Sequence, residues 1–162
     1  MSKIIATFFG AGLLRPAPGT WGSLAALPAA YLWVTLVGAP FFAASIVALY
    51  YLGLWATTQE TAGTTDHDPS EIVIDEVVGQ WIALLPAIVG AFYMKTSLLA
   101  LWPGWVAAFV LFRLFDIIKP WHVGIADRRE DATGVMLDDV IAGAYAAFCV
   151  VILAAIYHIG WM

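Results

Sequence analysis

The feature that most constrains this chain is a series of five long apolar segments separated by short polar stretches. A hydrocarbon core about 30 Å thick is crossed by roughly 20 consecutive apolar residues in a helix, so each segment is close to the length of one membrane span. The sequence therefore predicts an all-α polytopic membrane helical bundle, formed by one domain over residues 1–162. The predicted spans cover residues 22–37, 39–58, 77–94, 97–115 and 140–161.

The composition supports a membrane protein and argues against a nucleic-acid partner. Hydrophobic residues make up 62% of the chain and charged residues 12%, against roughly 45–50% and 25% in soluble domains. The net charge is −5 without any basic run, which is not the pattern of a nucleic-acid-binding surface. The one cysteine, Cys149, lies in an apolar run and offers neither a disulfide framework nor a paired-thiol metal motif.

Residues 4–14 form a sixth apolar stretch that is too short to span. It contains Gly10 and Gly12, so we expect an interfacial or re-entrant segment there. The first predicted span is also short and carries Pro28, which leaves open whether it crosses completely.

The distribution of charge predicts which side of the membrane carries the chemistry. If all five segments cross, Lys3, Arg15, Lys119, Arg128 and Arg129 share one side, and Lys95 lies on the other. The positive-inside rule makes the first side cytoplasmic. All twelve acidic residues fall on that side too, and none is clearly placed at mid-membrane, as a conducting pore or transporter would require. We expect a reaction centre at the cytoplasmic surface.

Two pairs of consecutive carboxylates stand at the edges of apolar segments: Asp75 with Glu76, and Asp138 with Asp139. Adjacent negative charges at a bilayer edge are costly to desolvate, and a bound divalent cation would compensate them. Hard oxygen donors without a cysteine or histidine cluster indicate Mg²⁺ as the cofactor. Asp116, at the end of the fourth span, is a further candidate ligand or catalytic base.

Asp68 and Glu71 are additional candidate metal ligands. Together with Asp75 they fall at i, i+3 and i+7, so a helix beginning near Pro69 would align all three carboxylates on one face. The helix dipole also favours acidic residues in the first turn of a helix, so Asp68 and Glu71 could stabilise the helix without binding a metal.

Three elements are candidates for binding phosphate. The turn from Pro16 to Ser23 precedes an apolar helix, with Thr20 and Ser23 as possible N-caps, and amides at a helix N-terminus attract anions. Arg113 and Lys119 supply positive charge, although Arg113 and Asp116 one turn apart also suit a simple ion pair. Mg²⁺ beside basic residues is the combination that phosphoryl transfer requires.

With these motifs in order along nearly the whole chain, the sequence resembles the phosphatidylglycerophosphatase A family. Those bacterial membrane enzymes hydrolyse phosphatidylglycerophosphate to phosphatidylglycerol and phosphate. The matching stretches are Pro18-Gly-Thr-Trp-Gly-Ser-Leu24, Asp68 with Ile72-Val-Ile-Asp-Glu-Val-Val-Gly-Gln-Trp81, Phe112-Arg-Leu-Phe-Asp116 with Lys119-Pro-Trp121, and Gly134-Val-Met-Leu-Asp-Asp-Val-Ile-Ala-Gly143.

The resemblance implies Mg²⁺ dependence, a phospholipid substrate and a place in the bacterial inner membrane. The chain departs from the family at His122, where proline is usual, and at Asp131-Ala132, where a glycine pair is usual, which leaves Gly134 as the candidate loop residue for phosphate. The competing interpretation is a small membrane cation carrier or a non-catalytic membrane subunit. The candidate catalytic residues are Asp75, Glu76, Asp116, Asp138 and Asp139. The candidate metal ligands are Asp75, Glu76, Asp138 and Asp139, with Asp68 and Glu71 as additional candidates. The candidate phosphate-binding residues are Thr20, Arg113, Lys119 and Gly134.

Overall fold

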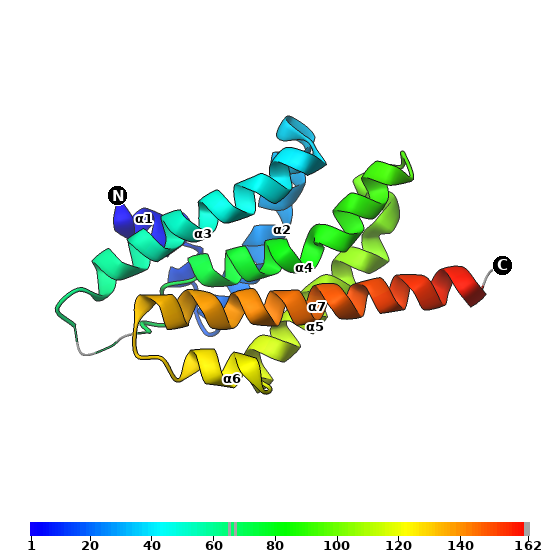
Figure 1. Ribbon diagram of the computed structural model, residues 1–162. Coiled ribbons are helices and arrows are strands. Elements are labelled where there is room, and N and C mark those ends of the chain that lie inside the picture. The colour runs from blue at the N-terminus through cyan, green and yellow to red at the C-terminus, as the bar shows by residue number, and fades with distance from the viewer. Residues whose placement is uncertain (65, 67, 161–162) are drawn as a thin grey trace.

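The computed structural model describes residues 1–64, 66 and 68–160, and this part of the chain forms helices joined by turns and loops, without a strand. Five helices are long and apolar enough to cross a membrane, which confirms the predicted all-α bundle. Figure 1 shows their arrangement. In chain order the elements are α1 (Ser2–Ala6), η1 (Ala11–Leu13), α2 (Pro18–Val37), α3 (Ala39–Thr61), α4 (Ile74–Tyr93), η2 (Leu98–Leu101), α5 (Trp102–Ile118), α6 (His122–Asp127) and α7 (Ala132–Gly160).

Several helices begin earlier than the apolar segments from which they were predicted. The first span begins at Pro18, because proline fits the first turn, where its missing N–H is not needed. The last begins at Ala132 and has 29 residues, about 43 Å at 1.5 Å per residue, longer than the hydrocarbon core. A helix of this length can extend beyond the hydrocarbon core, and Asp138 and Asp139 belong to its early turns. The predicted end of this span, Trp161, lies outside the described residues.

The N-terminal segment does not span. It consists of α1, a tight turn and η1, and α1 packs against α3. The amide of Val73 donates a 2.8 Å hydrogen bond to the carbonyl of Ala6, which ties α1 to the loop before α4. In Figure 1 the N-terminus, the α3–α4 loop and α6 lie at one end of the bundle, away from the α2–α3 turn, the α4–α5 turn and the C-terminus.

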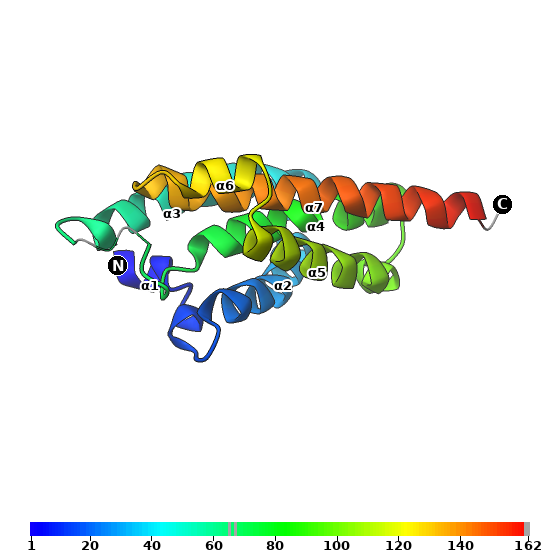
Figure 2. The same cartoon turned by 90° about the horizontal axis from the view of Figure 1, so that it is seen from below.

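Helix α4 is the centre of the bundle and packs against α2, α3, α5 and α7. The indole Nε1 of Trp81 donates to the carbonyl of Ala26 at 3.1 Å, so this buried polar group is satisfied between α4 and α2. On another side of the bundle, α6 lies along the first half of α7 (Figure 2).

A close crossing of α4 and α7 positions the functional residues. A Cβ atom added to Gly79 would lie 2.6 Å from the carbonyl oxygen of Asp139, and one added to Gly143 would overlap the backbone of Gly79. The two helices run in the same direction (Figure 1). Asp75 precedes Gly79 by one turn and Asp139 precedes Gly143 by one turn, so the glycine contact brings these carboxylates side by side.

Candidate active site

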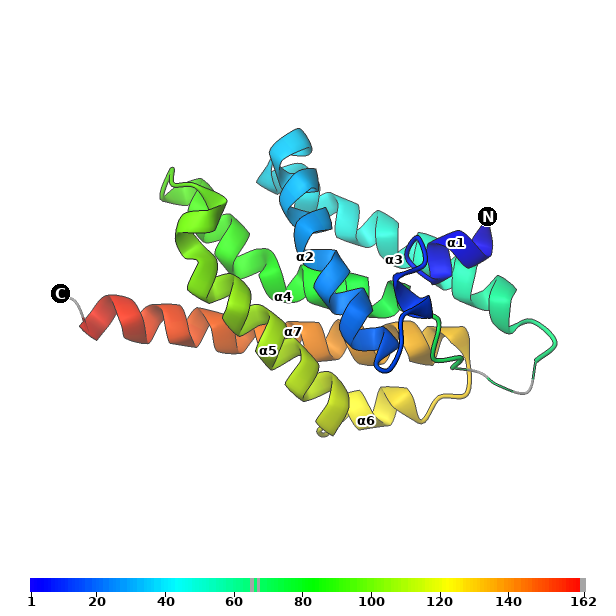
Figure 3. The ribbon, with the colours of Figure 1, turned by 180° about the vertical axis from the view of Figure 1, so that it is seen from behind.

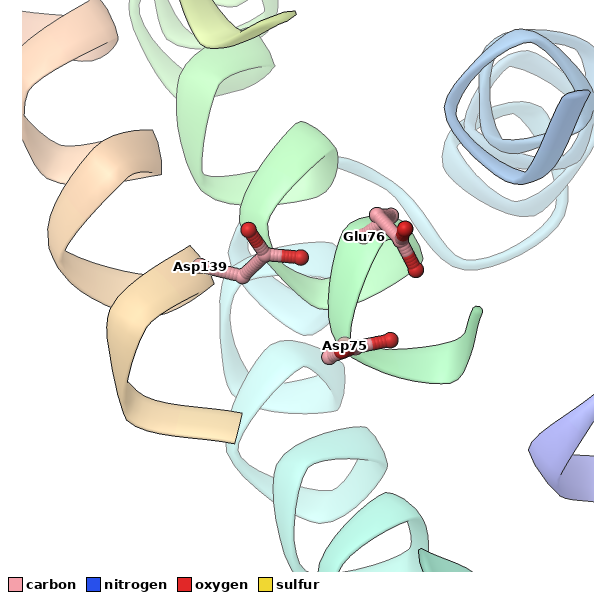
Figure 4. Close-up of side chains that lie close together, drawn as sticks. All are labelled: Asp75, Glu76 and Asp139. Carbon is pink, nitrogen blue, oxygen red and sulfur yellow. The ribbon is translucent and has the colours of Figure 1, made fainter. Parts of the chain in front are cut away.

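Three carboxylates from the first turn of α4 and the second turn of α7 form a cluster, shown in Figure 4. Asp75, Glu76 and Asp139 each offer an oxygen, and these oxygens all lie within 4.8 Å of one another. Asp75 is 6% exposed and Asp139 2%, and Glu76 is only slightly more accessible. Such crowding of buried acids is unfavourable unless protons or a cation neutralise it.

The hydrogen-bonding state of this cluster fits a metal ion. One oxygen of each acid is buried without a hydrogen-bond partner among the described residues: Oδ1 of Asp75, Oε2 of Glu76 and Oδ1 of Asp139. A buried polar atom without a partner costs free energy, and coordination to a cation removes that cost. An all-oxygen donor set suits a hard divalent ion such as Mg²⁺.

The cluster opens into a cavity of about 370 Å³. Its walls come from the start of α2, the loop before α4, the start of α4, the end of α5 and the early turns of α7. Segments far apart in the sequence thus converge on one space. Among the predicted site residues, those that line it are Thr20, Asp68, Asp75, Glu76, Arg113, Asp116, Lys119, Asp138 and Asp139.

Arg113 is a cationic group in contact with the acidic cluster. Its Nη1 lies 2.5 Å from Oδ2 of Asp116 and 4.0 Å from Oε1 of Glu76, so the predicted pair with Asp116 exists and extends toward the cluster. Nη1 also donates to Oγ of the fully buried Ser23 at 3.4 Å. The Nε of Arg113 is buried and has no hydrogen-bond partner among the described residues.

Ser23 has a different role from the one expected. The prediction that Thr20 or Ser23 caps the helix is wrong, because α2 already begins at Pro18 with Ala17 as its N-cap. Inside the helix, the Ser23 hydroxyl donates to the carbonyl of Gly19 at 2.8 Å and accepts from Arg113. This contact between α2 and α5 was missed because spacing along the sequence does not show which helices are neighbours.

Lys119 stands on the other side of the cavity, at the C-terminal end of α5, in a left-handed backbone conformation (φ 49°). Its Nζ contacts Oδ1 of Asp127 and lies 3.0 Å from Oδ2 of Asp138. Burial by itself lowers the pKa of the Lys119 ammonium, but the hydrogen bonds and charges of Asp127 and Asp138 outweigh it and raise the pKa above its ordinary value. Lys119 therefore remains positively charged.

Asp138 differs from the three clustered acids in that both of its oxygens accept hydrogen bonds. Oδ2 accepts from Lys119, and Oδ1 accepts from the backbone amide of Asp139 at 2.9 Å. In this arrangement Asp138 orients Lys119.

The alignment expected for Asp68, Glu71 and Asp75 is wrong. Helix α4 begins at Ile74, and residues 68–73 form turns and an extended approach to it. Glu71 pairs with Lys3 at 3.3 Å and is not part of the cavity wall. Asp68 does line the cavity and keeps an exposed edge; the surrounding protein displaces water from its carboxyl and raises its pKa, an effect that the charge of Lys119 partly offsets.

Gly134 lies outside the cavity wall, at the start of α7. Its amide donates to Oδ1 of Asp131 at 2.7 Å, the contact that caps a helix N-terminus. Hydrogen bonds from Arg129 and from the Gly134 amide hold the pKa of the Asp131 carboxyl below its ordinary value. Asp131, one of the two residues at which the sequence departs from the expected glycine pair, thus serves as a cap for α7. Its carboxylate accepts the hydrogen bond of the Gly134 amide, which was expected to bind phosphate.

Comparison with known proteins identifies the family of the chain. The chain matches the phosphatidylglycerophosphatase A family over residues 4–154. It is 37% identical to a phosphatidylglycerophosphatase A of Haemophilus influenzae, covering 98% of this chain and 89% of that protein, and 34% identical to the one of Escherichia coli, covering 89% and 78%. A protein of Bacteroides thetaiotaomicron named as a candidate phosphatidylinositol-3-phosphatase is 38% identical, covering 88% and 87%.

No solved structure matches the chain. The family match covers the first four long helices, ends within α7 and includes every residue of the acidic cluster. The chain therefore belongs to the phosphatidylglycerophosphatase A family of membrane lipid phosphatases.

Proposed function

We propose that this protein is a Mg²⁺-dependent phosphatidylglycerophosphatase, which removes the terminal phosphate of phosphatidylglycerophosphate to give phosphatidylglycerol. The observation that carries the proposal is a single cavity lined both by three buried acids with unpartnered oxygens and by two cations, Arg113 and Lys119. Acidic and basic side chains around one cavity suit a metal ion and a phosphate together. Two of the relatives are named for this substrate, and a third is named for a different lipid phosphomonoester.

Asp75, Glu76 and Asp139 are the proposed metal ligands, because they combine proximity, burial and unpartnered oxygens. Asp138 and Asp68 line the same cavity and would contribute through outer contacts or a second ion. We assign no ligand role to Glu71, since it faces Lys3. When bound, Mg²⁺ supplies neutralisation of charge on the phosphate oxygens.

The phosphate would be held by the cationic groups of the cavity and by the start of α2. Arg113 would offer its guanidinium group, and Lys119 a permanent positive charge. The first turn of α2, with Thr20, lines the cavity, and the amides of a helix N-terminus favour an anion. Gly19 lies so close to Glu76 and Arg113 that a side chain there would enter the site. Asp116, which pairs with Arg113, would orient a water molecule and accept its proton.

The site would face the cytoplasm, with the protein in the bacterial inner membrane. Lys3, Arg15, Lys119, Arg128 and Arg129 belong to the segments that gather at the end of the bundle carrying the cavity, and Lys95 lies in the α4–α5 turn. The positive-inside rule supports this orientation.

The test uses purified protein in detergent micelles with phosphatidylglycerophosphate, and free phosphate is measured. We expect EDTA to stop release and Mg²⁺ to restore it. Glu76→Gln is expected to lower kcat by about 100-fold or more, while the matched change Glu71→Gln retains activity because Glu71 lies outside the cavity. Phosphate release that is indifferent to EDTA and to Glu76→Gln would refute the proposal. Cation flux in proteoliposomes without phosphate release would support a carrier instead.

A further inference from the structure

The cavity has an apolar edge that the catalytic groups do not use. Ala17 and Pro18 at the start of α2 and Ile117 near the end of α5 form part of its wall. Ile117 is 69% exposed and Ala17 is also exposed, so these wall residues lie at the outer surface of the bundle as well. The cavity therefore reaches the lateral surface between these two helix ends.

This edge is continuous with the phosphate-binding side of the site. Ile117 follows Arg113 by one helical turn, on the same face of α5. The start of α2 faces that side of α5, since Ser23 contacts Arg113 and Gly19 lies against its Nη1. Figure 3 shows α2 and α5 side by side, with the beginning of one near the end of the other.

The size of the cavity requires an opening for the rest of a lipid. At about 370 Å³ it lies at the lower end of the range for small-molecule sites, enough for a headgroup but not for two acyl chains. A phospholipid bound here must leave the cavity through one of its edges. The edge formed by Asp68 and Ser70 is polar, and the edge formed by Ala17 and Ile117 is apolar. Acyl chains are expelled from water, so only the apolar edge suits them.

We propose that the cavity opens sideways into the membrane between the start of α2 and the end of α5, and that the glycerol backbone and first acyl methylenes of the phospholipid substrate lie against Ala17 and Ile117. This inference rests on the proposed function. It makes Ile117 a specificity-determining residue that favours long-chain lipid over a water-soluble headgroup. The substrate reaches the acidic cluster from the bilayer, with its phosphate turned toward Arg113.

The experiment compares two neighbouring isoleucines. Ile118 is 63% exposed, nearly as much as Ile117, but is not part of the cavity wall. Phosphate release is measured with Ile117→Asn, Ile117→Leu and Ile118→Asn from two substrates: dioleoyl phosphatidylglycerophosphate, which is the long-chain substrate, and its deacylated, water-soluble headgroup. The quantity of interest is the ratio of kcat/KM for the long-chain substrate to kcat/KM for the deacylated headgroup. Thermal unfolding of each variant checks folding, and Ile117→Ala replaces Ile117→Asn if that variant is unstable.

We expect Ile117→Asn to lower this ratio by about tenfold, mainly through the KM of the long-chain substrate, because a polar group replaces apolar contact with the lipid. Ile117→Leu and Ile118→Asn should change it less than about twofold. An equal fall in the Ile117→Asn and Ile118→Asn variants, or no fall in either, would overturn the lateral opening. Wild-type protein that releases phosphate from neither substrate would instead refute the proposed function, and this inference with it.

Discussion

The ammonium nitrogen of Lys119 lies 3.0 Å from Oδ2 of Asp138 and also contacts Asp127, so one lysine at the end of α5 joins α6 to α7 beside the cavity. Two carboxylates from different helices thereby fix a flexible side chain. The conformational entropy of the Lys119 side chain is therefore lost when the protein folds, and binding of the substrate does not have to order it. Asp127 was not among the residues expected from the sequence, because its connection to the site depends on how α6 packs against α7.

Removing one of these anchors should weaken substrate binding. We expect Asp127→Asn to raise KM by about fivefold to tenfold, with a smaller effect on kcat, because a charge-assisted hydrogen bond to Lys119 is lost. Steady-state kinetics with phosphatidylglycerophosphate measures the two constants. Glu130→Gln, a change at an exposed acidic neighbour, is the control. Equal KM values for both variants would show that Asp127 does not position Lys119.

The acidic cluster should destabilise the protein when no metal is bound. We expect Asp139→Asn to abolish activity but to raise the unfolding temperature of EDTA-treated protein, since one of three crowded, buried acids becomes neutral. Mg²⁺ should stabilise the wild type, because a ligand that binds only the folded state raises its stability. It should have little effect on Asp139→Asn. Thermal unfolding in detergent, followed by circular dichroism with and without Mg²⁺, measures both effects. If Mg²⁺ stabilises Asp139→Asn as much as it stabilises the wild type, Asp139 is not a metal ligand.

Much of the fold was predictable from the sequence, because the bilayer sets the length and composition of each span. Five apolar segments gave five helices, and the carboxylate pairs marked the end of the bundle at which they meet. The helix starts were less predictable, since Asp138 and Asp139 lie on a helix that extends beyond its apolar part. The alignment of Asp68 and Glu71 failed because it assumed a helix where the chain forms a turn, and Glu71 pairs with Lys3 of the N-terminal segment.

The crossing of α4 and α7 at Gly79 should be essential for the geometry of the site. A methyl group there would press on the ring of Phe112 and on the carbonyl of Asp139, so the helices must separate. We expect Gly79→Ala to destabilise the protein by about 1–3 kcal/mol and to abolish Mg²⁺-dependent turnover.

Gly90→Ala on the same helix is the control for Gly79→Ala. A Cβ atom at position 90 would meet only Leu101 at 3.5 Å, an ordinary contact. Phosphate release and thermal unfolding of the two variants distinguish the effects. If Gly79→Ala behaves like Gly90→Ala, the close approach of the two helices does not determine the position of Asp75 relative to Asp139.

Ser23 should act on catalysis through Arg113. Its hydroxyl accepts from Nη1 of Arg113 and donates to the carbonyl of Gly19, so Ser23→Ala removes a contact that orients the guanidinium beside Glu76. We expect kcat/KM to fall by about tenfold, the size of one lost hydrogen bond to a charged group.

A closely matched control for Ser23→Ala exists at the other end of the bundle. Ser45 also donates to the carbonyl four residues earlier, at 2.7 Å, and accepts from an indole Nε1, that of Trp33, at 2.8 Å. Ser45→Ala should leave turnover unchanged, since no charged group of the site depends on it. Ser23→Thr keeps the hydroxyl and should restore part of the activity. If the Ser23 contact is merely structural, Ser23→Ala and Ser45→Ala will both lower the unfolding temperature and will have similar kcat/KM values.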